Sequence, residues 1–333
     1  MQKFELPTSP GLRILRVELN LTGVRWFFGP PKTSIFAAFN HLNFNYDKFK
    51  KRFEQETVLR NLSEKTRKSY WWHIADYSNF CKKDPEHTGV EELRAYFQSM
   101  LTDGNHKPGS VKMGYFALRF LFTNIYHKEW AKEYLPTPKV AKTLPVVLSK
   151  DEVTDVLGAI GNFKHRTIIM LIYSTGARVS ESVNIKLTDI DSKRMQINIQ
   201  EGKGLKQRKV PLSPVLLSVL RDYYRQYKPG YYLFEGAGGK GTHLGVSAVR
   251  AICINARHRT LHIKKPYTPH TFRHSFATHH LEQGTNLLVI QRLMGHSDLS
   301  NTLKYLHVQQ LNTDQVINPL DTLERLEGLC KIK

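Results

Sequence analysis

The chain has 333 residues, with 49 Lys and Arg against 29 Asp and Glu, so its formal net charge is +20. This length predicts about two domains, and a hydrophobic fraction of 41% is enough to build their cores. The excess of positive charge favours a polyanionic partner, of which nucleic acid is the commonest. A basic surface that serves only solubility or a membrane surface is the alternative.

The three cysteines, Cys81, Cys253 and Cys330, are far apart and form no CxxC pair. This pattern argues against a disulfide framework and against a zinc site. The sequence has no run of roughly 18 apolar residues, the length needed to span a bilayer, and its start lacks the apolar core of a signal peptide. We therefore expect a soluble cytoplasmic protein with no membrane partner.

Residues 1–53 show no pattern that predicts a fold, and we treat them as an N-terminal extension. Residues 54–135 have helical periodicity from Ser63 onward. Thr88 and Glu91 form a candidate capping box, which predicts the start of a further helix. This region is therefore predicted to be a small all-α domain.

Three prolines between Tyr134 and Pro145 disfavour helix, so residues 136–148 are predicted to be an extended linker. Ser149 and Glu152 then form a second capping box, which opens a domain that we place at residues 149–325.

Apolar and polar residues alternate at 195–199, and the alternation resumes at 209–212 after a Gly-Lys-Gly break. This predicts a β-hairpin, and residues 231–234 predict a further short strand. The remaining segments have helical character, with expected helix ends at Gly284 and Gly295. The expected fold class is mainly α with a small antiparallel β-sheet.

Reactive side chains of this domain gather in short segments. In chain order, these are residues 174–181, 201–212, 268–278 and 293–307. The third segment contains His270 and Arg273, which share a helix face because they are three residues apart. A single His-x-x-Arg is a weak signal, but the ordered set of Arg, Lys, His-x-x-Arg, Gly-His and Tyr is a specific one.

This ordered set, over residues 144–320, resembles the catalytic domain of the tyrosine recombinases, the phage-integrase family that includes the Xer proteins. The preceding helical domain resembles the DNA core-binding domain of that family. The resemblance implies an enzyme that cleaves and rejoins DNA through a 3′-phosphotyrosine intermediate. It implies the catalytic residues Arg178, Lys203, His270, Arg273, His296 and Tyr305, with Tyr305 as the nucleophile.

The chemistry of these side chains fits the implied reaction. Attack on a phosphodiester builds charge on the non-bridging oxygens, which Arg178 and Arg273 can bind through charge-assisted hydrogen bonds. A phenol has a pKa of about 10, so Tyr305 needs help with deprotonation at neutral pH. We assign that role to His270.

A proton is also needed on the departing 5′-oxygen, and Lys203 on the hairpin tip fits this role, with Lys206 as the fallback. His296 would hydrogen-bond the transferring phosphate. The reaction requires no metal and no nucleotide cofactor, and the sequence has no phosphate-binding GxxxxGK[ST] loop. The spacing of His270 and His274 would also suit a zinc helix, but no HExxH follows.

Family resemblance further implies double-stranded DNA with specific recombination sites as the partner. It implies a homotetramer on two sites, association with the nucleoid and a possible accessory DNA-bending protein. The chain after Tyr305 would dock on a neighbouring protomer or pack on its own domain. The long N-terminal extension favours the integrase of a mobile element over a resolvase of chromosome dimers.

Three other functions remain as alternatives. A type IB topoisomerase uses similar chemistry without exchanging partners. A DNA-binding protein that has lost activity would lack Tyr305 or one of the arginines, and all of these are present. A metal-dependent nuclease would be inhibited by chelators.

Overall fold

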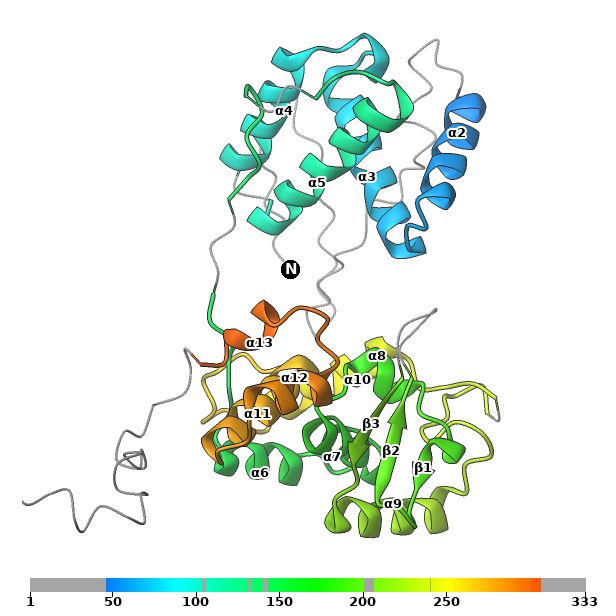
Figure 1. Ribbon diagram of the computed structural model, residues 1–333, viewed down its shortest axis with the longest axis vertical. Helices are drawn as coiled ribbons and strands as arrows, with labels where there is room; N and C mark the ends of the chain where they lie inside the picture. Colours follow the sequence, from blue (N-terminus) through cyan, green and yellow to red (C-terminus); the bar gives the residue numbers. More distant parts are fainter. Residues whose placement is uncertain are drawn as a thin grey trace, which may run out of the picture. The chain divides into compact units, whose positions relative to one another are not determined.

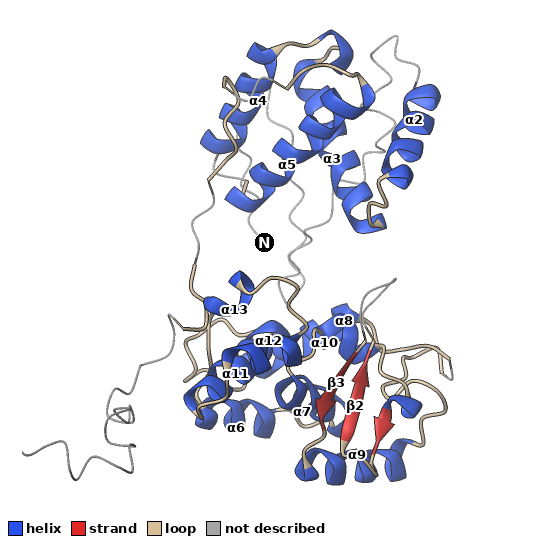
Figure 2. Cartoon of the chain, in the orientation of Figure 1, coloured by secondary structure: helices blue, strands red, loops and turns tan. Residues whose placement is uncertain are grey.

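The computed structural model describes residues 46–103, 106–130, 133–139, 143–200, 207–239 and 241–306. The chain divides into two compact units, Met1–Ala141 and Lys142–Lys333 (Figure 1). Each unit has a hydrophobic core of its own. The described residues are mainly helical, with a small antiparallel sheet in the second unit (Figure 2). This confirms the predicted fold class. In the described part of the chain, no helix has the length and apolar character needed to cross a membrane.

The first unit is a bundle of helices around an aromatic core. Its elements are α2 (Tyr46–Leu59), α3 (Glu64–Cys81), the 3-10 turn η1 (Pro85–His87), α4 (Val90–Thr102), α5 (Pro108–Phe120) and the π-helical turn η2 (Leu121–Ile125). Phe49 and Phe53 of α2 pack in the same core as Tyr77, Tyr96 and Tyr115. Helix α2 therefore runs across residue 53, where the sequence-based division separates an extension from the helical domain.

Helix α4 begins one residue later than predicted. The backbone N–H of Gly89 donates to the Glu92 carboxylate at 2.9 Å, so these residues, and not Thr88 and Glu91, cap the helix. The Thr88 hydroxyl is engaged elsewhere, because it donates to a carbonyl of η1 and accepts a 2.8 Å bond from Tyr77. The prediction of a Thr88 cap was wrong because the Thr88 hydroxyl is bonded to Tyr77 and to η1, and so does not cap the helix.

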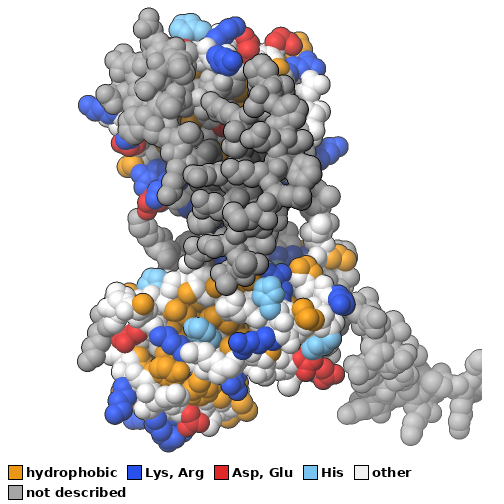
Figure 3. All heavy atoms as spheres, turned by 180° about the vertical axis from the view of Figure 1, so that it is seen from behind, with side chains coloured by type: hydrophobic (Ala, Val, Ile, Leu, Met, Phe, Trp, Pro, Cys, Tyr) orange, Lys and Arg blue, Asp and Glu red, His pale blue; other side chains and the backbone are white. Residues whose placement is uncertain are grey.

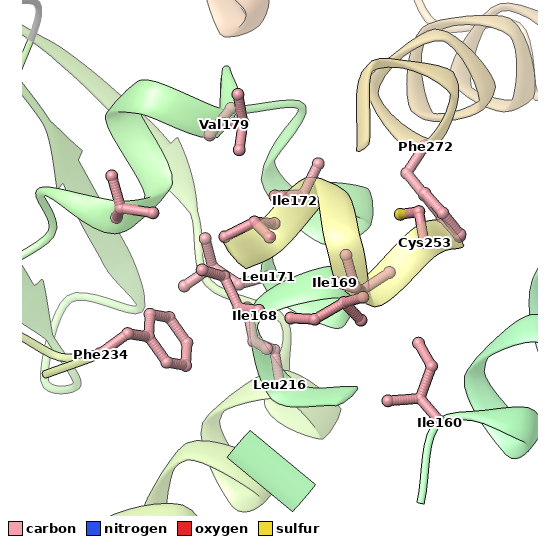
Figure 4. Packing of buried hydrophobic residues seen from close by; sticks show 14 of the residues in the cluster. Ile160, Ile168, Ile169, Leu171, Ile172, Val179, Leu216, Phe234, Cys253 and Phe272 are labelled. Carbon is pink, nitrogen blue, oxygen red and sulfur yellow. The ribbon is translucent and has the colours of Figure 1, made fainter. Parts of the chain in front are cut away.

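The second unit is built around helix α7. Its helices are α6 (Lys150–Ala159), α7 (Phe163–Thr175), α8 (Val179–Val183), the 3-10 turn η3 (Leu187–Asp189), α9 (Pro214–Tyr227), α10 (Val246–Arg257), α11 (Pro269–Glu282), α12 (Leu287–Met294) and α13 (Ser300–Leu303). Ile168 and Leu171 of α7 are fully buried, and Figure 4 shows this helix packed among Phe234, Leu216 and Phe272. The capping box that opens α6 has the predicted form, because Ser149 and Glu152 exchange bonds of 2.7 and 3.1 Å.

The sheet contains β1 (Ile190–Asp191), β2 (Gln196–Ile199) and β3 (Arg208–Pro211), in that order and antiparallel. Ile199 pairs with Arg208 at the end of the β2–β3 hairpin, which the sequence predicts. The hairpin tip, residues 201–206, lies outside the described residues. The strand predicted at residues 231–234 is reduced to one bridge between Tyr232 and Lys186.

Candidate active site

Arg178 stands where helix α7 gives way to α8. Gly176 ends α7 in the left-handed conformation, with φ of 62°, and Arg178 is the N-cap of α8. Its guanidinium donates to Glu181 at 2.6 Å and to the Gly295 carbonyl at 3.0 Å. The Arg178 backbone N–H also donates to Glu181, at 2.7 Å. Glu181 thus fixes both the start of α8 and the direction of the arginine side chain.

Arg273 lies on α11 and is almost entirely buried. It donates to the Gly176 carbonyl at 2.5 Å and to the Met294 carbonyl at 2.6 Å. Burial, together with the nearby charge of Arg178, lowers its pKa to about 10. The side chain is therefore still cationic at neutral pH.

Arg208, at the start of β3, also binds Glu181, and it is not among the site residues predicted from the sequence. Its two terminal nitrogens donate to the two oxygens of Glu181, at 3.2 and 2.6 Å, and its Nε donates to the Leu293 carbonyl at 2.7 Å. Arg208 is one of several basic residues around the hairpin, and no local signal distinguishes it. Only the fold reveals that its side chain is buried against a carboxylate.

Three successive carbonyls at the end of α12 each accept a bond from a different arginine. The pairs are Leu293 with Arg208, Met294 with Arg273 and Gly295 with Arg178. A helix C-terminus carries partial negative charge, so it stabilises cations placed there. The arrangement holds three guanidinium groups close together, which suits the binding of an anion such as a phosphate.

Tyr305 follows α13 and has no exposed surface. Its hydroxyl lies 2.8 Å from Nδ1 of His274, and its ring is nearly parallel to that of His296. Burial raises the pKa of Tyr305 to about 12, and the charges of Arg273 and Arg178 act in the opposite direction. The phenol is therefore protonated at neutral pH.

Two predicted histidines also lie at this site. Nδ1 of His296 is 2.9 Å from the Thr302 hydroxyl, and burial with the charges of Arg273 and Lys304 lowers its pKa to about 3. His270, at the start of α11, is exposed. Partial loss of hydration and the charge of Arg273 lower its pKa as well. Both imidazoles are therefore neutral at pH 7.

The structure thus places five of the six predicted residues in this unit, on the segments that follow α7, form α11 and follow α12. The sixth, Lys203, lies outside the described residues. The histidine bonded to Tyr305 is His274, which the sequence reading considered only as a zinc ligand. Within the described residues, no group of three or more His, Cys, Asp or Glu side chains is arranged to hold a metal ion.

Comparison with known proteins shows the family to which the chain belongs. The profile described as "Phage integrase family" matches residues 146–311, and that of the "Phage integrase, N-terminal SAM-like domain" matches residues 49–132. A protein of Sinorhizobium fredii that carries the description "integrase/recombinase" is 37% identical over 83% of this chain and 89% of its own length. A tyrosine recombinase of Thermosipho africanus is 32% identical over 75% of this chain and 91% of its own.

Solved structures share the fold at lower identity. A lambda integrase dimer bound to a core site has a TM-score of 0.66 and 18% identity, over 81% of this chain and 98% of the other. The XerH site-specific recombinase bound to a palindromic substrate has a TM-score of 0.62 and 22% identity, over 79% of this chain and 82% of the other. The chain belongs to the phage integrase family of tyrosine recombinases.

Proposed function

We propose that this recombinase acts on specific sites in double-stranded DNA, with Tyr305 as the nucleophile. The Tyr305 oxygen forms a bond to phosphorus, the bond from phosphorus to the 5′-oxygen breaks, and a proton passes to that oxygen. The resulting phosphotyrosine conserves the energy of the broken bond, so a 5′-hydroxyl from another strand can reverse the step. The observation that carries this proposal is that Arg178 and Arg273 bind the neighbouring carbonyls of Gly295 and Met294, and that Tyr305 lies in the same hydrophobic cluster as Met294.

The arginines bind the non-bridging oxygens and stabilise the charge that develops on them. His296 is neutral. When its Nδ1 accepts from Thr302, the proton lies on Nε2, which is then able to donate to the phosphate. We assign proton removal from Tyr305 to His270, whose neutral state at pH 7 suits a base. Protonation of the 5′-oxygen is assigned to Lys203 by family resemblance.

We further propose a homotetramer on two DNA sites, which exchanges strands in pairs, with the help of an accessory DNA-bending protein where a site requires one. One relative of similar fold, lambda integrase, has been solved as a tetramer bound to a Holliday junction. The net charge of +20 supports a DNA partner, and Lys and Arg side chains (blue) lie on the visible surface of both units in Figure 3. Such an enzyme would work in the cytoplasm, on the DNA of the nucleoid.

Integration and excision of a mobile element is the biological role that we propose. The solved structures of similar fold include the integrase of the Tn1549 transposon, and the long N-terminal extension supports the same class. A topoisomerase would give its product from one duplex, whereas a recombinase needs two.

The test is covalent attachment. The protein is incubated with nicked DNA that carries a candidate site and is then denatured, and we expect wild type to remain bound to DNA, undiminished by a chelator. Tyr305→Phe removes the attacking oxygen and should abolish attachment. Tyr267→Phe is the matched control, because Tyr267 is an equally buried tyrosine of the same unit that bonds only to Thr260 in the hydrogen bonds observed. Equal attachment by wild type and Tyr305→Phe contradicts the proposal.

A further inference from the structure

The nucleophile stands in a position from which it cannot attack. Tyr305 has 0% exposed surface and packs among Phe276, Leu281, Ile290 and Met294. A reacting oxygen must come within about 3 to 3.5 Å of its target. An enclosed side chain leaves no room for a DNA phosphate at that distance, so Tyr305 has to move before it reacts.

Among the residues that the structure describes, the enclosed hydroxyl has one hydrogen-bond partner, His274. The phenol oxygen lies 2.8 Å from Nδ1, and the two ring centroids are 5.7 Å apart. Burial, and after it the charges of Lys304 and Arg273, lower the pKa of His274 to about 4. The imidazole is therefore neutral at pH 7, and Nδ1 accepts the phenol proton while Nε2 carries the ring proton.

This hydrogen bond does not make His274 a base. The pKa is about 12 for the phenol and about 4 for the imidazolium. Full proton transfer from the phenol to the imidazole in this position is therefore strongly unfavourable. The contact instead satisfies a buried hydroxyl, which would otherwise lose its hydrogen bonds to water without replacement.

We propose that His274 is a positioning residue that holds Tyr305 in a sheltered resting place, and that Tyr305 leaves this bond before it attacks DNA. The inference rests on the proposed role of Tyr305 as nucleophile. Its consequence is that removal of the acceptor at His274 increases the time that Tyr305 spends exposed, since the buried hydroxyl is then unsatisfied.

The experiment measures Tyr305 exposure in the full chain without DNA. N-acetylimidazole transfers an acetyl group to accessible tyrosine hydroxyls, and peptide mass spectrometry gives the rate at each tyrosine. Tyr267, fully buried and bonded to Thr260, is the internal reference. We expect His274→Leu to raise acetylation of Tyr305 at least about five-fold and leave Tyr267 unchanged. His274→Asn has the same branched side-chain shape as Leu but keeps an acceptor close to Nδ1, so it should stay within about two-fold of wild type.

An unchanged Tyr305 rate in His274→Leu overturns the inference. If both tyrosines react faster, the substitution has loosened the fold, and His274→Gln decides. Gln keeps a polar side chain but moves the amide away from the Nδ1 position, so a rise confined to Tyr305 supports the inference, and any other result overturns it. Because these rates need no DNA, they are independent of the attachment assay. If wild type attaches to DNA but the acetylation rate of Tyr305 is unchanged in the His274 variants, only the role of His274 is refuted.

Discussion

Glu181 shows at the scale of one residue how the site keeps its arginines in place. Its side chain is almost completely buried and is bound by Arg178 and Arg208, with Arg273 at 3.9 Å. Burial opposes ionisation of the carboxyl, but the bonds from Arg208 and Arg178 outweigh it and lower its pKa. The carboxylate therefore stabilises the fold while it orients Arg178, to which we assign phosphate binding.

We expect Glu181→Gln to destabilise the second unit by about 3 kcal/mol at pH 7, because it leaves buried arginines without their counter-charge. The folded pKa of Glu181 lies below the unfolded value. Its stabilising contribution is therefore complete above the unfolded pKa and is lost as the pH falls through the folded pKa. Urea unfolding from pH 7 to pH 3 should show the gap between wild type and variant closing at the acidic end.

Asp222→Asn is the control for this prediction, since it removes the same charge from an exposed pair with Arg225. Pairs of this kind contribute about 1 kcal/mol or less. A Glu181→Gln protein as stable at pH 7 as Asp222→Asn, or a gap that widens with acid, would show that the arginine cluster does not depend on this carboxylate.

At the scale of elements, the ends of α7 and α12 form the frame of the site. Gly176 ends α7, and its carbonyl binds Arg273. The left-handed conformation at Gly176 favours glycine. A Cβ atom there would also stand 2.5 Å from the ring of Phe276. Two helix ends are thus held together by one arginine, which explains why a buried cation belongs in this core.

We predict that Gly176→Ala costs at least about 2 kcal/mol more than Gly284→Ala, because overpacking is added to backbone strain. Both glycines have positive φ, of 62° and 80°, but a Cβ at Gly284 would meet nothing within 4 Å. Thermal unfolding of the two variants measures the difference. Gly176→Ala should also slow covalent attachment to DNA, since the carbonyl that anchors Arg273 must shift. Equal stability of the two variants contradicts the close packing at Phe276.

At the scale of the whole molecule, the chain consists of two units with separate cores. We propose that residues 54–135 with α2 bind the core of the DNA site, that 136–148 link the units and that 149–325 carry the chemistry. Residues 1–45 and 307–333 lie outside the described residues, so the N-terminal extension and the docking of the C-terminal stretch stay predictions.

Limited trypsin digestion tests this division. Lys139 is exposed in the proline-containing segment between the units, and we expect early cleavage after it. Two fragments should then persist, because each retains a hydrophobic core of its own. Mass spectrometry of the products identifies the cut. First cleavage within α3 or α7, with no lasting fragments, would contradict two independently folded units.

The ordered motif identified the family, and local patterns predicted much of the fold. Helical periodicity at α3, the capping box before α6 and the alternation of β2 and β3 are each encoded within a few neighbouring residues. The prediction for α4 was off by one residue, because Tyr77 and η1 compete for the Thr88 hydroxyl. Phe49 and Phe53 gave no helical signal that we recognised, although they pack in the aromatic core.

By itself, the sequence determined the fold class, the family and the residue types available for phosphate chemistry, since these depend on short segments and on their order. Only the tertiary structure decided which groups meet. Arg208 reaches Glu181 from 27 residues away, and Tyr305 reaches His274 from 31. These contacts arise because packing of α7, α11 and α12 brings distant segments together, and no local pattern records which side chain a buried carboxylate or phenol will find.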